Sequence, residues 1–186
     1  NQMGKVEGNL NTRFELNEKW STAILAHAEY NGTKHDNNDD TFLDDPLVQQ
    51  LNFFNRWRYK GENLRLQFGF KYLTENRQGG QMNFDPGKSH DTENGYGIGV
   101  ETDRYEGFFK LGYVLENRDK SSLGFQNQVV YHDVTPFYGL NDYKADQFSY
   151  YGNLMFQSYI SDTRHQYIAG ISYSLDNYNQ QLNDTS

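Results

Sequence analysis

The sequence has no cysteine, only three prolines and no long apolar run among its 186 residues. Without cysteine, the chain has no disulfide bonds, thiol nucleophiles or thiolate metal sites. The most apolar stretch, Ala23-Ile24-Leu25-Ala26, is far shorter than the roughly 18 residues that a membrane-spanning helix needs. These absences exclude helical membrane proteins and disulfide-stapled scaffolds.

Positive charge is also scarce, because 17 Lys and Arg stand against 25 Asp and Glu, for a net charge of -8. Nucleic-acid phosphates attract a basic surface, so we expect no nucleic-acid partner. No start-like methionine, charged n-region or apolar h-region opens the chain, so we expect no signal peptide. The chain is therefore expected to be a mature product or an excised fragment.

Aromatic residues, by contrast, are abundant: the chain has 15 Tyr and 13 Phe. Aliphatic residues are few, and the mean hydropathy is -0.94. Such a chain cannot fill an ordinary aliphatic core, yet it is too rich in aromatic residues for disorder. We expect one domain, or a piece of a larger one, that is a secreted β protein or spans a membrane as strands.

Apolar and polar residues alternate with a period of two almost throughout, and sustained helical spacing does not occur. In the segment 64–72, for example, every even position holds Leu, Phe or Tyr. Similar segments predict about eight strands. Over 96–115 we predict one long strand rather than a hairpin bent near Asp103-Arg104, because the alternation continues in phase.

The predicted connections alternate in length. Short turns are expected near 17–19, 60–62, 117–121 and 161–164, and long polar loops at 31–46, 77–95 and 135–146. In an up-and-down meander the two groups fall at opposite ends, which is typical of membrane β-barrels. We therefore predict an all-β fold, an antiparallel up-and-down meander of about eight strands, forming part of a transmembrane β-barrel over residues 1–186. A soluble twisted sheet or sandwich with one wet face is the alternative.

The aromatic residues fit a barrel whose interfaces are marked by aromatic girdles. We expect Trp20, Trp57 and Tyr59 at the short-turn ends of their strands. Five tyrosines are expected towards the long-loop ends: Tyr30, Tyr72, Tyr131, Tyr150 and Tyr173. Apolar residues of the strands would then face lipid, and polar residues would face the lumen.

Seven segments spread over nearly the whole chain share one resemblance: WSTAILAH at 20–27, FLDDPL at 42–47, NRW at 55–57, FKLGY at 109–113, YHD at 131–133, FYG at 137–139 and YGNLMFQS at 151–158. Together they resemble the barrel of TonB-dependent outer-membrane receptors from Bacteroidota-type bacteria. The resemblance implies a non-enzymatic importer in the outer membrane of a Gram-negative bacterium. Its barrel would have about 22 strands around an N-terminal plug domain.

The resemblance also implies partners: outer-membrane lipid, the plug domain, the remaining barrel strands, TonB acting through the plug, and a small-molecule nutrient such as an iron chelate, a corrinoid or a glycan. The chain holds no plug domain, too few strands for that barrel and no terminal aromatic residue. We therefore expect an internal segment of the barrel wall. The alternatives are a complete small eight-stranded outer-membrane barrel and a soluble secreted β-sheet module that binds glycans.

The first long loop contains an acidic segment with the spacing of an oxygen-ligand calcium loop. The residues that follow the pattern D-x-[DN]-x-D-x-x-x-D are Asp36, Asn38, Asp40 and Asp44. Thr41 replaces the usual glycine and Leu47 the usual Glu, while Asp39 and Asp45 offer substitute carboxylates. In the resembled family, corrinoid receptors carry calcium on such loops. Calcium is therefore the one cofactor hypothesis, and a solvated acidic loop is the alternative.

Two further groups of polar residues are candidate contacts. On the long loops they are Asn83, Tyr138, Asn141 and Tyr143, whose rings and amides suit a nutrient ligand. On the polar face of neighbouring strands they are Arg56, Arg58, Arg65 and Lys71. This basic patch either contacts a plug or an anionic ligand, or is ordinary lumen lining paired with Glu75 and water.

Catalysis is not expected. The five histidines share no ligand spacing, and no Ser/His/Asp motif with an elbow-type turn occurs. His27 and His132 are expected to point into the lumen near the loop end. The alternating Gly95, Gly97 and Gly99 indicate a close backbone approach or a bend.

Overall fold

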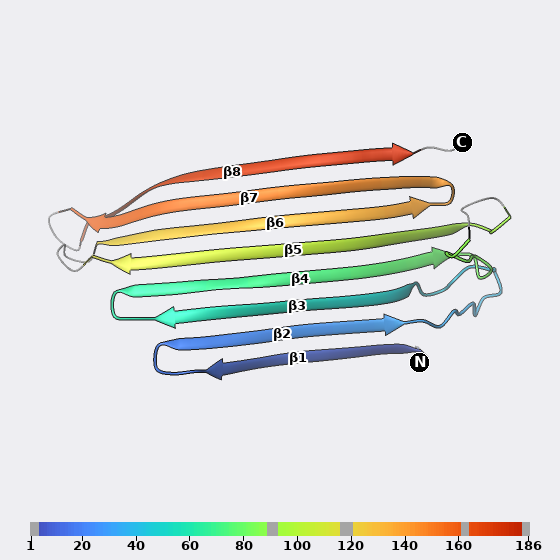
Figure 1. Ribbon diagram of the computed structural model, residues 1–186, viewed down its shortest axis with the longest axis horizontal. Coiled ribbons are helices and arrows are strands. Elements are labelled where there is room, and N and C mark those ends of the chain that lie inside the picture. The colour runs from blue at the N-terminus through green and yellow to red at the C-terminus, as the bar shows by residue number, and fades with distance from the viewer. Residues whose placement is uncertain (1–3, 89–92, 116–120, 161–163, 184–186) are drawn as a thin grey trace.

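The computed structural model describes residues 4–88, 93–115, 121–160 and 164–183. Its strands form one antiparallel sheet, in which each strand lies beside its sequence neighbours (Figure 1). The strands are β1 (Lys5–Glu15), β2 (Trp20–Asn31), β3 (Leu47–Lys60), β4 (Leu64–Gly80), β5 (Gly97–Val114), β6 (Ser122–Tyr138), β7 (Asn141–Tyr159) and β8 (Gln166–Asn183). The predicted all-β, eight-stranded meander is confirmed.

The alternation of the sequence is reproduced by the pairing of the strands. Between β4 and β5 the register runs without a break from Leu64↔Tyr113 to Gly80↔Gly97. Asp103 and Arg104 lie inside this ladder, opposite Thr74 and Leu73. The prediction of one long strand in place of a bent hairpin is therefore confirmed.

The short turns are closed by local hydrogen bonds. Between β1 and β2, the Asn17 side-chain oxygen accepts the backbone N–H groups of Lys19 and Trp20, each at 2.9 Å. Between β3 and β4, the Gly61 N–H donates to the Leu64 carbonyl at 2.8 Å. The turns predicted near 117–121 and 161–164 fall mostly outside the described residues.

One of the three predicted long loops is wrong. The segment 135–146 is a tight hairpin, because β6 continues to Tyr138 and β7 begins at Asn141. Gly139 has a φ of 60°, which suits a two-residue turn. The pairing of β6 with β7 skips Thr135 and Pro136, of which the proline lacks an N–H, and resumes at Phe137↔Asp142. Because this segment contains a proline and many polar residues, the prediction ended β6 too early and began β7 too late.

The other two long connections are present with adjusted bounds. The first spans 32–46, close to the predicted 31–46. The second begins at Gln81 rather than at residue 77, because β4 continues to Gly80. The long-loop end of the sheet thus carries two long loops and one tight hairpin. Two long loops, instead of the expected three, therefore lie at the end of the sheet that a membrane barrel would expose to the outside of the cell.

The sheet is a single open layer with almost no core. Among the described residues, the only buried hydrophobic side chains are Ala23, Val48 and Phe84. Strands β1 and β8 lie at opposite edges of the sheet (Figure 1), and β8 is exposed along its whole length. Within the described strands, the outer edges of β1 and β8 have no strand partner. One layer of strands thus leaves both faces and both edges uncovered.

Candidate functional site

The two faces of the sheet differ sharply in chemistry, because successive residues of a strand point to opposite sides. On β4 one face carries Leu64, Phe68 and Tyr72, and the other carries Arg65 and Lys71. The registers place the matching residues of the other strands beside these. We call the two sides the apolar face and the polar face.

The apolar face carries a band of nearly constant width. On six strands its aliphatic and aromatic residues lie within a span of nine residues, at 51–59, 64–72, 105–113, 123–131, 148–156 and 167–175. Towards the long-loop end the same face then becomes polar, with Asn76, Glu101, Asp103, Asp133 and Asp146. The apolar band therefore ends before the strands do.

Aromatic rings line both borders of this band. At the short-turn border, the ring centroids of Trp20 and Tyr59 are 4.9 Å apart, and one row further in, those of Trp57 and Phe68 are 6.4 Å apart. At the other border lie the pairs Tyr72–Tyr105, at 4.9 Å, and Tyr150–Tyr173, at 6.2 Å. The expected placement of Trp20, Trp57 and Tyr59 at the short-turn ends is confirmed.

The band runs obliquely across the strands. The hydrogen-bonded row that starts at Trp20 reaches Ile171 on β8, where the band continues four residues further, to Tyr167. The row that starts at Tyr30 reaches Thr135 on β6, where the band stops four residues earlier, at Tyr131. Over six and four steps between strands, respectively, these shifts of four residues correspond to a slant of about 25–35° at ~3.3 Å per residue and ~4.8 Å per strand.

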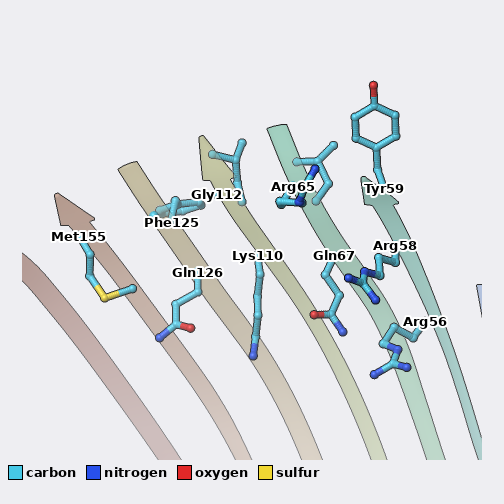
Figure 2. Close-up of a pocket in the computed structure, with 13 residues that line it drawn as sticks. Arg56, Arg58, Tyr59, Arg65, Gln67, Lys110, Gly112, Phe125, Gln126 and Met155 are labelled. Carbon is cyan, nitrogen blue, oxygen red and sulfur yellow. The ribbon is translucent and has the colours of Figure 1, made fainter. Parts of the chain in front are cut away.

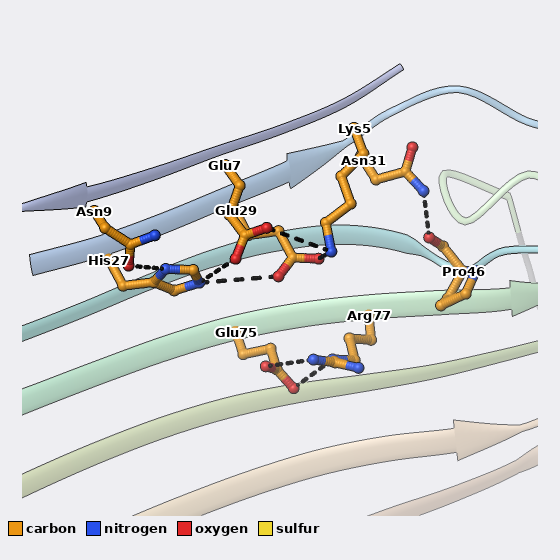
Figure 3. A network of polar contacts seen from close by, with 9 residues as sticks. All are labelled: Lys5, Glu7, Asn9, His27, Glu29, Asn31, Pro46, Glu75 and Arg77. Atoms are coloured by element: carbon orange, nitrogen blue, oxygen red, sulfur yellow. Dashed lines mark hydrogen bonds and ion pairs between the residues drawn. The ribbon is translucent and has the colours of Figure 1, made fainter. Parts of the chain in front are cut away.

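On the polar face, near the long-loop end, charged residues of β1 and β2 form a network (Figure 3). Lys5, at the start of β1, places its Nζ 2.9 Å from a Glu29 oxygen. This hydrogen bond is the main cause of the raised pKa of Lys5. His27 Nε2 lies 3.9 Å from Glu7 and 3.9 Å from Glu29. Its other ring nitrogen is 2.9 Å from the Asn9 side-chain oxygen.

This network is a group that spacing along the sequence did not reveal. One ligand atom each from Glu7, His27 and Glu29 lies within 4.8 Å of the others, which is close enough for a shared metal ion. The group forms because the register places Glu7 opposite Glu29 and Asn9 opposite His27. His27 thus lies on the polar face, as expected, and so does His132, which is opposite Arg104.

The four residues of the calcium hypothesis share one loop, and their oxygens accept hydrogen bonds from nearby N–H groups. Asp36 accepts from the Thr41 backbone at 2.8 Å, Asp40 from the Phe42 backbone at 2.8 Å, and Asp44 from the Asn37 backbone at 2.8 Å. Asn38 donates to Asp40 at 3.0 Å. Thr41, at the position of the usual glycine, has a φ of 72°. Calcium binding at Asp36, Asn38, Asp40 and Asp44 stays a prediction.

Three of the four residues predicted to contact a nutrient lie on the β6–β7 hairpin. Tyr138 and Asn141 face each other across the turn. Tyr143 donates a hydrogen bond to the Gln180 side chain at 3.1 Å and lines a hollow of about 480 Å³. Asn83 lies on the loop after β4, and no described hydrogen bond joins it to the other three. Ligand binding by these residues stays a prediction.

The two long loops are joined to each other. Lys34 donates from its ammonium group to the carbonyls of Met82 and Phe84, at 2.8 and 2.9 Å. The ring of Phe84 is 2 % exposed and lies 5.7 Å from the ring of Phe137. The loop surface beside the hairpin is therefore ordered by one buried ring and one bridging lysine.

The predicted basic patch divides into two parts. Lys71 lies 3.3 Å from Glu106, which also binds Arg104 at 2.7 Å. The expected partner Glu75 instead binds Arg77, at 2.8 Å. The remaining residues, Arg56, Arg58 and Arg65, line a hollow near the short-turn end of the polar face, together with Lys110 (Figure 2). Sequence analysis missed Lys110, although its place in the alternation puts it on the polar face.

Comparison of the chain with protein-family models, with curated proteins and with solved structures gives no match. Among the described residues, no helix has the length and apolar character to cross a membrane. The geometry of the two faces therefore carries the functional argument.

Proposed function

We propose that this chain is a barrel-wall segment of a TonB-dependent outer-membrane receptor that imports a scarce nutrient, such as an iron chelate, a corrinoid or a glycan. The apolar face would contact lipid and the polar face would line the lumen. The long-loop end would face the outside of the cell. The observation that carries the proposal is the apolar band on one face of a single-layer sheet.

The dimensions of the band support this proposal. A strand that crosses a bilayer needs about 9–11 residues, and the band is nine residues wide on six strands. The strands of membrane barrels tilt by about 35–45°, and the slant of the band approaches that range. Aromatic borders on both sides match the girdles of such barrels.

The uncovered surface favours lipid over water as the neighbour of the apolar face. Exposed side chains of the band include Phe70 at 46 %, Leu154 at 43 % and Ile171 at 71 %. A water-soluble protein rarely exposes apolar patches larger than a few hundred Å². A soluble glycan-binding sheet would need a second layer to cover this face, and the described residues form only one.

The open edges support a larger barrel. Unpaired backbone groups are costly in hydrocarbon, so strands that cross a bilayer belong to closed barrels. The described β1 and β8 lie at opposite edges of the sheet instead of pairing with each other. Additional strands would therefore adjoin β1 and β8.

Growth assays test the receptor proposal. In the source bacterium, loss of the protein that contains this chain is expected to abolish growth on one iron chelate, corrinoid or glycan supplied at limiting concentration. Loss of TonB should abolish the same growth. Growth that needs this protein but not TonB would contradict the proposal. A purified chain that is folded and monomeric without detergent would support the soluble alternative.

A further inference from the structure

A hollow near the short-turn end of the polar face is surrounded by cations. Its volume is about 540 Å³, within the usual range for small-molecule sites. Arg56 and Arg58 enter it from β3, Arg65 from β4 and Lys110 from β5 (Figure 2). None of the described residues that line it is Asp or Glu.

The shape of the hollow follows from the register. Gly112 lies opposite Gly124, so two adjacent strands lack side chains at the same level. Arg65 lies beside Gly112, and Met155 lies beside Gly124. The two glycines form the floor of the hollow, and the longer side chains on either side form its walls.

The next row supplies hydrogen-bond donors. It runs from Arg58 through Gln67 and Lys110 to Gln126, each directly opposite the next across four strands. Guanidinium and ammonium groups bind phosphate and carboxylate oxygens strongly, and arginine does so in a bidentate manner. The amides of Gln67 and Gln126 add neutral N–H donors.

The cations of the hollow differ from four other cations on the polar face. Lys5, Lys71, Arg77 and Arg104 each form an ion pair with a glutamate. No described carboxylate forms an ion pair with the cations of the hollow, and Arg65 donates instead to the carbonyl of Gly61. The hollow is thus a concentration of uncompensated positive charge in a chain whose net charge is -8.

We propose that this hollow binds a small oxyanion with several negative charges, carried as phosphate or carboxylate groups. Its volume and its glycine floor fit a compact anion. It lies at the opposite end of the strands from the loops that carry the predicted nutrient contacts. The hollow does not depend on insertion into a membrane, so this proposal and the receptor proposal fail independently.

Isothermal titration calorimetry tests the hollow, with inorganic pyrophosphate and citrate added separately to the folded protein that carries this chain. We expect saturable heat for at least one of the two, and the stronger binder assigns phosphate or carboxylate chemistry. Arg58→Gln and Lys110→Gln should each weaken binding by about tenfold. The absence of saturable heat with both anions at concentrations up to about 10 mM would overturn the proposal.

Two further variants separate a site from general electrostatics. Arg13→Gln removes the same charge from the polar face of β1, where Arg13 pairs with Glu15, and should change the affinity less than twofold. Gly124→Leu fills the floor without changing any charge, and should abolish binding. Circular dichroism checks that each variant is folded, and Gly112→Ala serves in its place if Gly124→Leu does not fold. Equal losses in Arg13→Gln and Arg58→Gln, or full binding by the filled variant, would contradict a defined site.

Discussion

At the residue scale, two glycines of β5 make the loop surface possible. A side chain at Gly97 would overlap the ring of Phe84, and one at Gly99 would overlap the ring of Phe137. These two rings pack against each other where the loop after β4 meets the sheet. The alternating glycines predicted to mark a close approach therefore do so, between backbone and aromatic rings.

Gly97→Ala tests this packing. We expect the new methyl group to displace Phe84 and to weaken docking of the loop by about 1–3 kcal/mol. Amide hydrogen exchange should become faster over 81–88 and stay unchanged over 105–113. Gly107→Ala is the matched control, because Gly107 lies on the same face of β5 with open space around it. Equal effects of the two substitutions would contradict the account.

Also at the residue scale, a hydrogen-bonded group interrupts the apolar face. The Asn55 amide donates to the Thr22 hydroxyl at 3.0 Å and to the Ala23 carbonyl at 3.1 Å. The Trp57 indole N–H donates to Asn55 at 2.6 Å. Asn55 thus satisfies a border tryptophan and links β2 to β3 within an apolar setting.

Asn55→Ala is expected to destabilise the fold by about 1–3 kcal/mol, because it leaves the Trp57 N–H without its acceptor. Urea unfolding in detergent or lipid, followed by circular dichroism, measures the change. Asn127→Ala is the control, since Asn127 lies on the same face of β6 and no hydrogen bond of its side chain is present among the described residues. A loss of stability at Asn127 as large as that at Asn55 would contradict this role.

At the element scale, several contacts hold the two long loops together. A β-bridge between Phe42 and Gln81 and the hydrogen bond from the Met82 N–H to the Thr41 carbonyl reinforce the contacts of Lys34. The two loops therefore form one ordered surface over the ends of β2 to β5.

Lys34→Met tests this bridge, because methionine keeps most of the side-chain length and loses the ammonium donor. We expect chymotrypsin to cleave after Phe84 several-fold faster, since the buried ring is released more often. Lys19→Met, in a short turn at the other end, should leave the cleavage rate unchanged. An unchanged rate in Lys34→Met would show that the β-bridge alone holds the loops together.

The strands were predictable from the sequence because the alternation of apolar and polar residues indicates both that a segment is a strand and which residues lie on each face. Their ends were less predictable, as in 135–146, where tertiary pairing carries polar residues and Pro136 into strands. The group of Glu7, His27 and Glu29 was missed because it needs the register between β1 and β2. Lys110 was missed because the cations of the hollow come from three different strands, and only the register between those strands brings them together.

At the scale of the whole molecule, we propose that the apolar face contacts lipid and the polar face contacts water. The sheet has almost no core among its described residues, so its stability must come from strand pairing and from whatever covers the apolar band. In the proposed membrane setting, lipid would cover one face and an aqueous lumen would solvate the other. This arrangement would also explain why a chain with mean hydropathy of -0.94 carries so many aromatic residues.

A nitroxide scan of β4 tests this placement of the two faces. The chain has no cysteine, so single cysteines at positions 64–72 can each carry one spin label in the membrane-reconstituted protein. Collisions with lipid-soluble oxygen should be high at even positions such as Phe68 and low at odd ones such as Gln67. Collisions with a water-soluble nickel chelate should show the opposite alternation. High accessibility to the nickel chelate at both even and odd positions, or the absence of any alternation, would contradict a lipid-facing band.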